Sequence, residues 1–223
     1  MTPQIASFAT IGTAMTLLGK SRPSRSGPAW EVARLYPDQG RWEESDYLAL
    51  TEGLNQLVEL CDGRLEVLPM PKTSHQRIVQ YLSNLILAFV TPRKLGSVLF
   101  APLRVRLWDR TFREPDVVFM LAAHANRMGE DFWEGADLVM EVLSADPQDR
   151  KRDLVTKRRE YAAAGIGEYW IIDPRDRRVT VLKRRGKSYV VHAQGGEGKS
   201  VPSALLKGFE ADVTAIFEAA SGR

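Results

Sequence analysis

DLVMEVLS, residues 137–144, has the composition of a buried β-strand, yet it carries an acid, Glu141, near its middle. Side chains alternate along a strand, so Glu141 shares a face with Val139 and Leu143, and the opposite face is apolar as well. Apolar residues on both faces indicate a central strand. An ionised carboxylate buried there costs several kcal/mol unless it is paired or binds a metal. Glu141 therefore pairs with a buried arginine, lies near the strand end, or holds a cation.

A second acid, Asp116, begins another apolar strand in REPDVVFM, residues 113–120. An aspartate that follows a proline is often an exposed turn residue, and this reading stays open. If the two strands are neighbours, however, Asp116 and Glu141 can converge on one side of the sheet. Two carboxylates together with water are typical ligands of magnesium.

The third charged group, Lys157, lies on a helix expected from about Pro147 to Ala164, with Asp146 as its N-cap. At helical spacing Lys157 falls at the edge of the buried stripe, from which it can reach over the sheet. The alternative is an i,i+4 pair with Asp153 on a solvated face, worth only about 0.3–0.5 kcal/mol. Asp153 could also hold the lysine in place for catalysis.

The rest of the chain predicts an α/β or α+β fold, a sheet with helices covering its faces. An Asp62–Gly63 turn indicates a hairpin, and Ser74 is the expected N-cap of a long helix. Residues 1–40 are predicted to be a flexible N-terminal extension, because residues 19–30 are rich in Ser, Pro, Gly and Arg, and residues 41–223 form the domain. Expected helices cover residues 42–50, 75–90 and 211–220, expected strands 97–108, 115–120 and 168–173, and expected hairpins 57–70 and 179–193.

Composition excludes several classes of protein. The 223 residues carry a formal net charge of +3, which is compatible with a polyanionic partner without requiring one. Cys61 is the single cysteine, so an intramolecular disulfide and a cysteine-based zinc site are both excluded. This favours a reducing, cytoplasmic setting. Neither a secretory signal nor a membrane-spanning segment is expected.

Three segments, PDVVF, LVMEVLS and DLVTKRREYAAAGIGEYWIIDP, resemble a bacterial family of putative restriction endonucleases called Uma-two, within the PD-(D/E)XK nuclease superfamily. The resemblance covers about residues 42–217 and implies a restriction-endonuclease-like core, a central mixed β-sheet flanked by helices. It implies that Asp116 and Glu141 are the two acids of the motif. The usual lysine position, two residues after Glu141, holds Leu143 here, and the resemblance assigns the lysine to Lys157 instead.

This resemblance implies a magnesium- or manganese-dependent endonuclease that hydrolyses DNA phosphodiester bonds. Asp116, Glu141 and the Val142 carbonyl would hold the metal, and Lys157 would orient water or stabilise developing charge. Glu59, at a family-like position, would complete the metal's surroundings. His75 also sits at such a position, although a core or capping role suits it better. The resemblance further suggests a homodimer.

Basic residues that could follow a DNA backbone occur in three groups, although a solubilising surface would look the same. They are Arg104, Arg106, Arg110 and Arg113; Arg150, Lys151, Arg152, Arg158 and Arg159; and Arg175, Arg177, Arg178, Lys183, Arg184, Arg185 and Lys187.

Two other readings compete with the enzyme. The chain could be a catalytically inactive nuclease-fold module that binds DNA or a protein partner. Alternatively, Asp116, Glu141 and Lys157 could form a buried ion network with a purely structural role.

Overall fold

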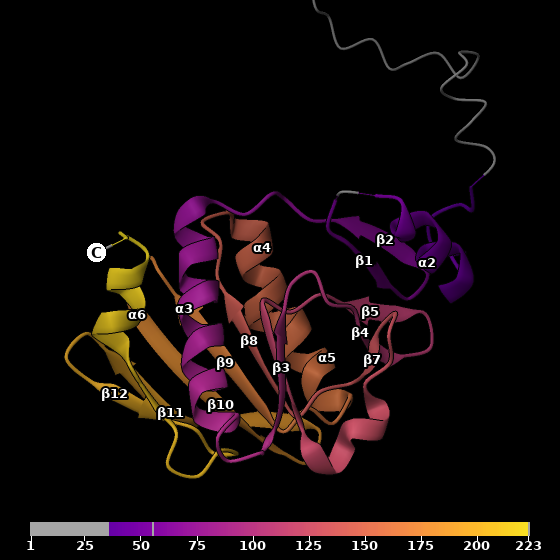
Figure 1. Cartoon of the computed structure of the whole chain (residues 1–223). Helices are drawn as coiled ribbons and strands as arrows, with labels where there is room; N and C mark the ends of the chain where they lie inside the picture. The colour runs from indigo at the N-terminus through magenta and orange to yellow at the C-terminus, as the bar shows by residue number, and fades with distance from the viewer. Residues whose placement is uncertain (1–35, 55, 223) are drawn as a thin grey trace, which may run out of the picture. The chain divides into compact units, whose positions relative to one another are not determined.

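The computed structural model describes residues 36–54 and 56–222, and its folded unit runs from Gln39 to Arg223 (Figure 1). Most of the predicted N-terminal extension, residues 1–40, lies outside the described residues, so its flexibility stays a prediction. None of the described helices combines the length and the apolar composition of a membrane-spanning segment.

A mixed six-stranded sheet forms the centre of the unit, as the sequence predicts, in the order β11-β10-β9-β8-β6-β3. Only β8 and β9 run parallel, and the other neighbours are antiparallel. The strand that carries Glu141 is β8, and all five of its residues are buried. The strands are β3 (Gly96–Phe100), β6 (Val117–Leu121), β8 (Leu138–Val142), β9 (Glu168–Asp173), β10 (Arg178–Arg185) and β11 (Ser188–Gly196).

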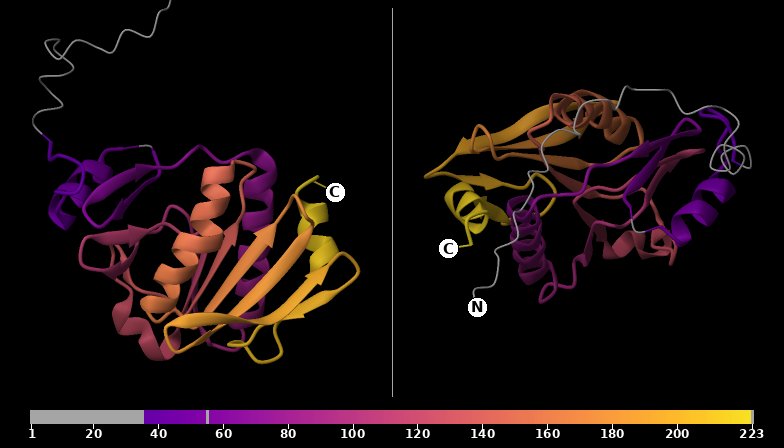
Figure 2. Two further views of the ribbon diagram at one scale, coloured as in Figure 1. Left: turned by 180° about the vertical axis from the view of Figure 1, so that it is seen from behind. Right: turned by 90° about the horizontal axis from the view of Figure 1, so that it is seen from above.

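Helices cover both faces of this sheet (Figures 1 and 2). On one face, α3 (Thr73–Val90) and α6 (Val213–Ala219) pack on Phe119, Met140 and Trp170. The other face carries Val139, Leu143 and Ile171, which pack with Tyr161. Tyr161 belongs to a continuous helical stretch made of α4 (Pro147–Lys151), a π-helical segment (Arg152–Lys157) and α5 (Arg158–Ala163).

A second, five-stranded sheet, which the sequence did not predict, has the order β2-β1-β5-β4-β7. Its predicted part is the β1–β2 hairpin, where Asp62 and Gly63 adopt positive φ angles of 47° and 72°. Such angles at both central residues define the tight turn that hairpins favour. The helix α2 (Glu44–Glu52) packs on this sheet through Tyr47. The strands are β1 (Val58–Cys61), β2 (Arg64–Val67), β4 (Val105–Trp108), β5 (Thr111–Arg113) and β7 (Trp133–Glu134).

Two local predictions were wrong. The strand expected over residues 97–108 is two strands, β3 and β4, in different sheets, because the chain turns at residues 101–104 around the cis Ala101–Pro102 bond. Lys72, not Ser74, is the N-cap of α3, and Ser74 lies in the first turn. The sequence also did not predict a 3-10 helix (Ala122–Arg127) and the short strands β12 (Ser200–Pro202) and β13 (Glu210–Asp212).

The predicted cap of the helical stretch after β8 is confirmed. Asp146 accepts hydrogen bonds from the main-chain nitrogens of Gln148 and Asp149, at 2.8 and 3.2 Å, and Pro147 occupies the first turn. Arg150 then donates two hydrogen bonds to Asp173 at the end of β9, at 3.0 and 2.6 Å. This pair ties the start of α4 to the same end of the sheet at which β8 ends.

The Arg150–Asp173 pair predicts an acid-sensitive contribution to stability. Burial would raise the pKa of Asp173, but the hydrogen bonds from Arg150 outweigh it and lower the pKa. A lowered pKa stabilises the fold above the ordinary aspartate value of about 3.9, and this contribution is lost as the pH falls through the folded-state value. In thermal melts from pH 7 to 2.5, Asp173→Asn should melt below the parent at pH 7, and the gap should narrow in acid.

Asp109→Asn is the control, because that side chain is 81% exposed and contributes little to stability. Its melting temperature should follow the parent at every pH. A gap for Asp173→Asn that stays constant down to pH 2.5 would contradict the prediction.

Candidate active site

The two acids of the predicted motif lie on neighbouring strands, as the hypothesis required. Val117 of β6 pairs with Met140 of β8, and the same antiparallel register places Asp116 beside Glu141. Asp116 has the same parity as Val118 and Glu141 the same parity as Val139, so both belong to the sheet face that α5 covers.

Asp116 is held against the end of β8. Its Oδ2 accepts a hydrogen bond of 2.7 Å from the Val142 main-chain nitrogen. The Nε2 atom of His75, in the first turn of α3, lies 3.3 Å from the same oxygen and 3.1 Å from the Val142 carbonyl oxygen. Burial would lower the pKa of His75, but the hydrogen bond and the charge of Asp116 outweigh it, and the pKa is raised. His75 therefore contacts two of the predicted metal-holding groups.

Glu141 is buried, and one of its oxygens accepts two hydrogen bonds. Oε1 accepts from Lys157 Nζ at 2.9 Å and from the Tyr161 hydroxyl at 2.6 Å. Burial raises the pKa of Glu141, and although the ammonium of Lys157 opposes this effect it does not cancel it. The buried pair that the sequence left open for Glu141 thus exists, but its partner is the lysine and not an arginine.

Lys157 points into the interior and is only 2% exposed, so the reading that places it on a solvated face is wrong. Its ammonium lies 2.9 Å from Glu59 Oε1, 2.9 Å from Glu141 Oε1 and 3.7 Å from Asp153 Oδ1. Burial would lower the pKa of Lys157, but these three acids raise it. Lys157 is the last residue of a π-helical segment. In a π-helix the rotation about the helix axis from one residue to the next is smaller than in the α-helix that the sequence predicted.

Glu59, on β1 of the five-stranded sheet, is fully buried and has both oxygens occupied. Oε1 accepts from Lys157 and from the Glu114 main-chain nitrogen at 3.0 Å, and Oε2 accepts from Arg113 at 2.7 Å. Burial would raise the pKa of Glu59, but the charges of Lys157 and Arg113 outweigh it and lower the pKa to about 2. Glu59 therefore fixes Lys157 from the second sheet.

Arg113 has no exposed surface, so its assignment to a DNA-binding surface was wrong. Its guanidinium donates to Glu59 and Glu66, each at 2.7 Å, and to both oxygens of Glu160 at 2.8 and 3.0 Å. A run such as Arg-Glu-Pro-Asp carries no periodic signal for burial, and the acids that surround Arg113 come from three separate elements. Sequence reasoning could not have found this role.

The donor set at the carboxylates fits a hard cation. Neither Asp116 Oδ1 nor Glu141 Oε2 has a hydrogen-bond partner among residues 36–54 and 56–222. The oxygen Asp153 Oδ1 is buried and lacks a hydrogen bond as well. Carboxylate oxygens of this kind are the ligands that Mg²⁺ and Mn²⁺ prefer. No group of three or more His, Cys, Asp or Glu side chains in the described part of the chain is arranged to hold a metal, so these two acids would need the Val142 carbonyl or water.

The predicted basic surface divides into two ends of the sheet. Arg175, Arg177 and Arg178 lie at the turn from β9 to β10. This turn is at the same end of the sheet as the end of β8, where Asp116 lies. The exposed residues near the β10–β11 turn, Lys183 to Lys187, lie at the opposite end, where Arg184 pairs with Gly167 before β9. Arg175, Arg177 and Arg178, together with Arg150, Lys151 and Arg152 at the start of the helical stretch, lie on the side of the acids.

A family profile described as "Uma2: Putative restriction endonuclease" matches residues 42–214. The chain belongs to the Uma2 family. The Uma2 match contains every predicted site residue, and the resemblance on which the prediction rested is thereby confirmed.

The Uma2 fold has a counterpart among solved structures, a putative nuclease of DUF820 from Anabaena variabilis. The alignment covers 82% of this chain and 99% of that chain, with 19% sequence identity and a TM-score of 0.64. At this identity the likeness concerns the fold. A search among curated proteins finds no match.

The buried arginine gives this Uma2 chain a testable weak point. Arg113→Met should lower the free energy of unfolding by about 3–5 kcal/mol, because Glu160 would stay buried without its cation and Glu59 would keep only Lys157. Urea denaturation followed by circular dichroism measures the change. Arg106→Met is the matched control, since Arg106 pairs with Glu44 and Glu134 at a partly exposed position and should cost about 1 kcal/mol or less. Equal losses in the two variants would contradict the prediction.

Proposed function

We propose that the chain is a magnesium- or manganese-dependent endonuclease that hydrolyses phosphodiester bonds in DNA. The observation that carries the proposal is that Asp116 lies beside Glu141 at the end of two neighbouring strands and that Lys157 contacts Glu141, with one oxygen of each acid left without a hydrogen bond. Membership of the Uma2 family supports it.

Asp116 and Glu141 would hold the cation through their free oxygens, and the Val142 carbonyl would be the third ligand. Bound there, a divalent cation supplies a water of lowered pKa and neutralises negative charge on the phosphate. The Val142 nitrogen fixes the orientation of Asp116, and Lys157 and Tyr161 fix that of Glu141. The ligands are thus oriented before substrate arrives, which is the condition for tight and specific binding.

The surrounding charges favour a cation. The acids outnumber the cations that face them, since Lys157 and Arg113 each contact three carboxylates and Glu59 is the one that they share. An excess of buried negative charge is costly, and a divalent ion removes that cost.

Lys157 would act on the reacting groups. Two of its three N–H groups point to Glu59 and Glu141, and the third is available to orient the attacking water or to stabilise charge on a phosphate oxygen. Glu59 and Asp153 act as positioning residues, because they contact the lysine from the second sheet and from its own helix.

The competing reading, an inactive module with a structural ion network, is favoured by one observation: acids of the protein already satisfy the buried ammonium of Lys157. Removing Glu141 does not leave Lys157 unpaired, since Glu59 remains at 2.9 Å. The stability of a Glu141 variant therefore cannot separate the two readings, and metal binding can. A live site should bind Mn²⁺ through Asp116 and Glu141, and an inactive module need not.

Nicking of supercoiled plasmid tests the activity. The wild type should nick in Mg²⁺ or Mn²⁺ and not in EDTA, and Asp116→Asn, Glu141→Gln and Lys157→Met should each lose at least about 100-fold in rate. Asp109→Asn, a change at an exposed acid outside the site, should keep the wild-type rate. Calorimetric titration with Mn²⁺ gives an independent readout, which Asp116→Asn and Glu141→Gln should abolish. Equal nicking by all variants, or none by the wild type, would refute the proposal.

Salt dependence tests which basic residues meet the DNA. In a metal-free buffer, log affinity for a DNA duplex should fall linearly with log salt. Lys151→Gln combined with Arg175→Gln should reduce the slope by about 2, because each phosphate contact contributes about 0.9. Arg185→Gln combined with Lys187→Gln removes the same charge at the far end of the sheet and should leave the slope unchanged. A larger effect from the second pair would place the DNA elsewhere.

A further inference from the structure

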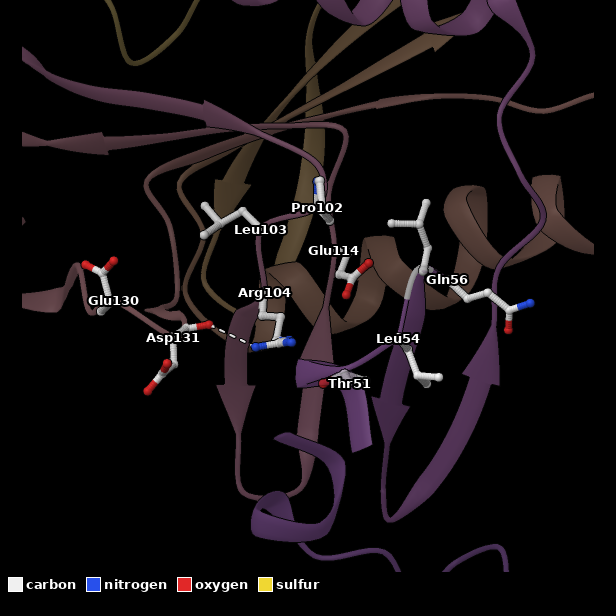
Figure 3. Close-up of a pocket in the computed structure, with 10 residues that line it drawn as sticks. Thr51, Leu54, Gln56, Pro102, Leu103, Arg104, Glu114, Glu130 and Asp131 are labelled. Atoms are coloured by element: carbon white, nitrogen blue, oxygen red, sulfur yellow. Dashed lines mark hydrogen bonds between the residues drawn. The ribbon is translucent and has the colours of Figure 1, made fainter. Parts of the chain in front are cut away.

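A pocket of about 530 Å³ is lined by residues of the stretches 51–57, 102–104 and 130–131 and by Glu114 (Figure 3). Its apolar lining comes from two separate stretches, Leu54 and Leu57 before β1, and Pro102 and Leu103 before β4. A volume of this size suits a small organic group, and apolar walls with a few polar side chains are typical of ligand pockets. None of the residues assigned to the candidate active site lines this pocket. Glu114, which does line it, lies two residues before Asp116.

Glu114 is the polar group that marks this pocket as a binding site. Its side chain is 7% exposed, and its Oε2 atom is buried without a hydrogen-bond partner. Within the described residues, neither oxygen of this carboxylate accepts a hydrogen bond, although the Glu114 main-chain nitrogen donates to Glu59. A buried acceptor left unpaired costs about 1–3 kcal/mol, so a bound donor would remove a penalty that the free protein carries.

Arg104 lines the same pocket and supplies the complementary group. Its guanidinium lies over the ring of Tyr47, 5.8 Å from the centroid, and donates to the Asp131 carbonyl oxygen at 3.4 Å. Figure 3 shows Glu114 and Arg104 among the lining residues, and no ion pair joins the two in the part of the chain that the structure describes. The pocket thus holds a carboxylate and a guanidinium that do not satisfy each other. A ligand that offers donors on one side and an acceptor on the other would bridge them.

Charge at the rim restricts the ligand further. Glu130 and Asp131 are exposed lining residues, so the pocket carries more negative than positive charge. A phosphate or a free carboxylate would be repelled, whereas a neutral, planar group fits between the apolar walls. Among nucleobases, guanine presents two adjacent donors, N1–H and N2–H, next to the acceptor O6. Two adjacent donors match the two oxygens of a carboxylate, and O6 matches an arginine.

We propose that this pocket binds an unpaired guanine of the nucleic-acid substrate, with Glu114 accepting from N1–H and N2–H and Arg104 donating to O6. This inference rests on the proposed function, because it names the base that lies beside the scissile phosphate. Glu114 precedes Asp116 by two residues, a span of at most about 7 Å. A base in the pocket therefore belongs to a nucleotide next to the one whose phosphate reaches Asp116. The pocket gives the enzyme a base preference that no helix-turn-helix or similar motif supplies.

Fluorescence anisotropy at pH 8 in EDTA tests the pocket without cleavage. The probes are labelled duplexes that carry one extrahelical guanine, one extrahelical hypoxanthine, which lacks the N2 amino group, or an abasic site at the same position. The wild type should bind the guanine probe at least about 10-fold more tightly than the abasic probe, with hypoxanthine in between. Glu114→Gln should equalise the affinities for guanine and hypoxanthine, read as the ratio of the two within that variant. Arg104→Met should reduce the guanine-to-abasic ratio, and Asp109→Asn should leave every ratio unchanged.

Two results with these probes would overturn the inference: equal wild-type affinity for the guanine and abasic probes, or an unchanged guanine-to-hypoxanthine ratio in both Glu114→Gln and Arg104→Met. Calorimetric binding of spermidine that depends on Glu114, without base discrimination, would assign the pocket to a cation and overturn it as well. Plasmid nicking by the same preparations separates the two proposals. Nicking without base discrimination refutes the pocket alone, and base discrimination without nicking supports the pocket and refutes the nuclease activity.

Discussion

The buried ammonium of Lys157 is the interaction on which the rest of the site depends. It comes from the helical stretch that covers the six-stranded sheet, and it contacts Glu141 of that sheet and Glu59 of the other one. Three elements distant in the chain meet at this single charge. Because each buried acid needs a cation, and the lysine needs its acids, none of the three can shift alone without leaving a charge unpaired. The same buried charges therefore form the candidate site and join the two sheets.

Arg113 extends this network of buried charges away from the residues proposed to act on the substrate. It joins Glu59 to Glu160 on α5 and to Glu66 on β2, so the β1–β2 hairpin is held to the same helix that places Lys157 and Tyr161. The order of the site thus depends on a guanidinium that touches none of the groups proposed to bind substrate. The proposed site consists of two acids and a lysine, and a further set of charged residues behind them holds them in place.

Several elements of the fold could be predicted from sequence, because their signals are local. The apolar run of β8, the Asp62–Gly63 turn and the Asp146 cap each act within a few residues. The five-stranded sheet as a whole could not be predicted, since β5 and β7 are too short to show alternation, and the pairings of β1 with β5 and of β4 with β7 join distant parts of the chain. The break between β3 and β4 was missed for a related reason. Apolar residues continue through it, and only the change of sheet reveals it.

For the site, the placement of the two acids was predicted better than their surroundings. Asp116 and Glu141 were expected to converge, and the strands that carry them are neighbours. Lys157 was chosen with the help of family resemblance, and the helical spacing used beside it was wrong, because the segment is π-helical. The burial of Arg113 and the unpaired carboxylate of Glu114 left no trace in spacing or composition. Both depend on which long-range neighbours happen to surround a charged side chain.

The π-helical segment also determines how this region can change in length during evolution. Such a segment accommodates one more residue per turn than an α-helix, and an insertion is a common way to form one. Deleting a single residue between Arg152 and Lys157 would convert the π-helical segment to a regular α-helix. The side chains after the deletion would then be rotated about the helix axis by about 100° relative to those before it. The ammonium and the Tyr161 hydroxyl could then no longer both reach Glu141. Relatives that keep this site should therefore differ in the amino acids of the segment 152–157 but not in its length.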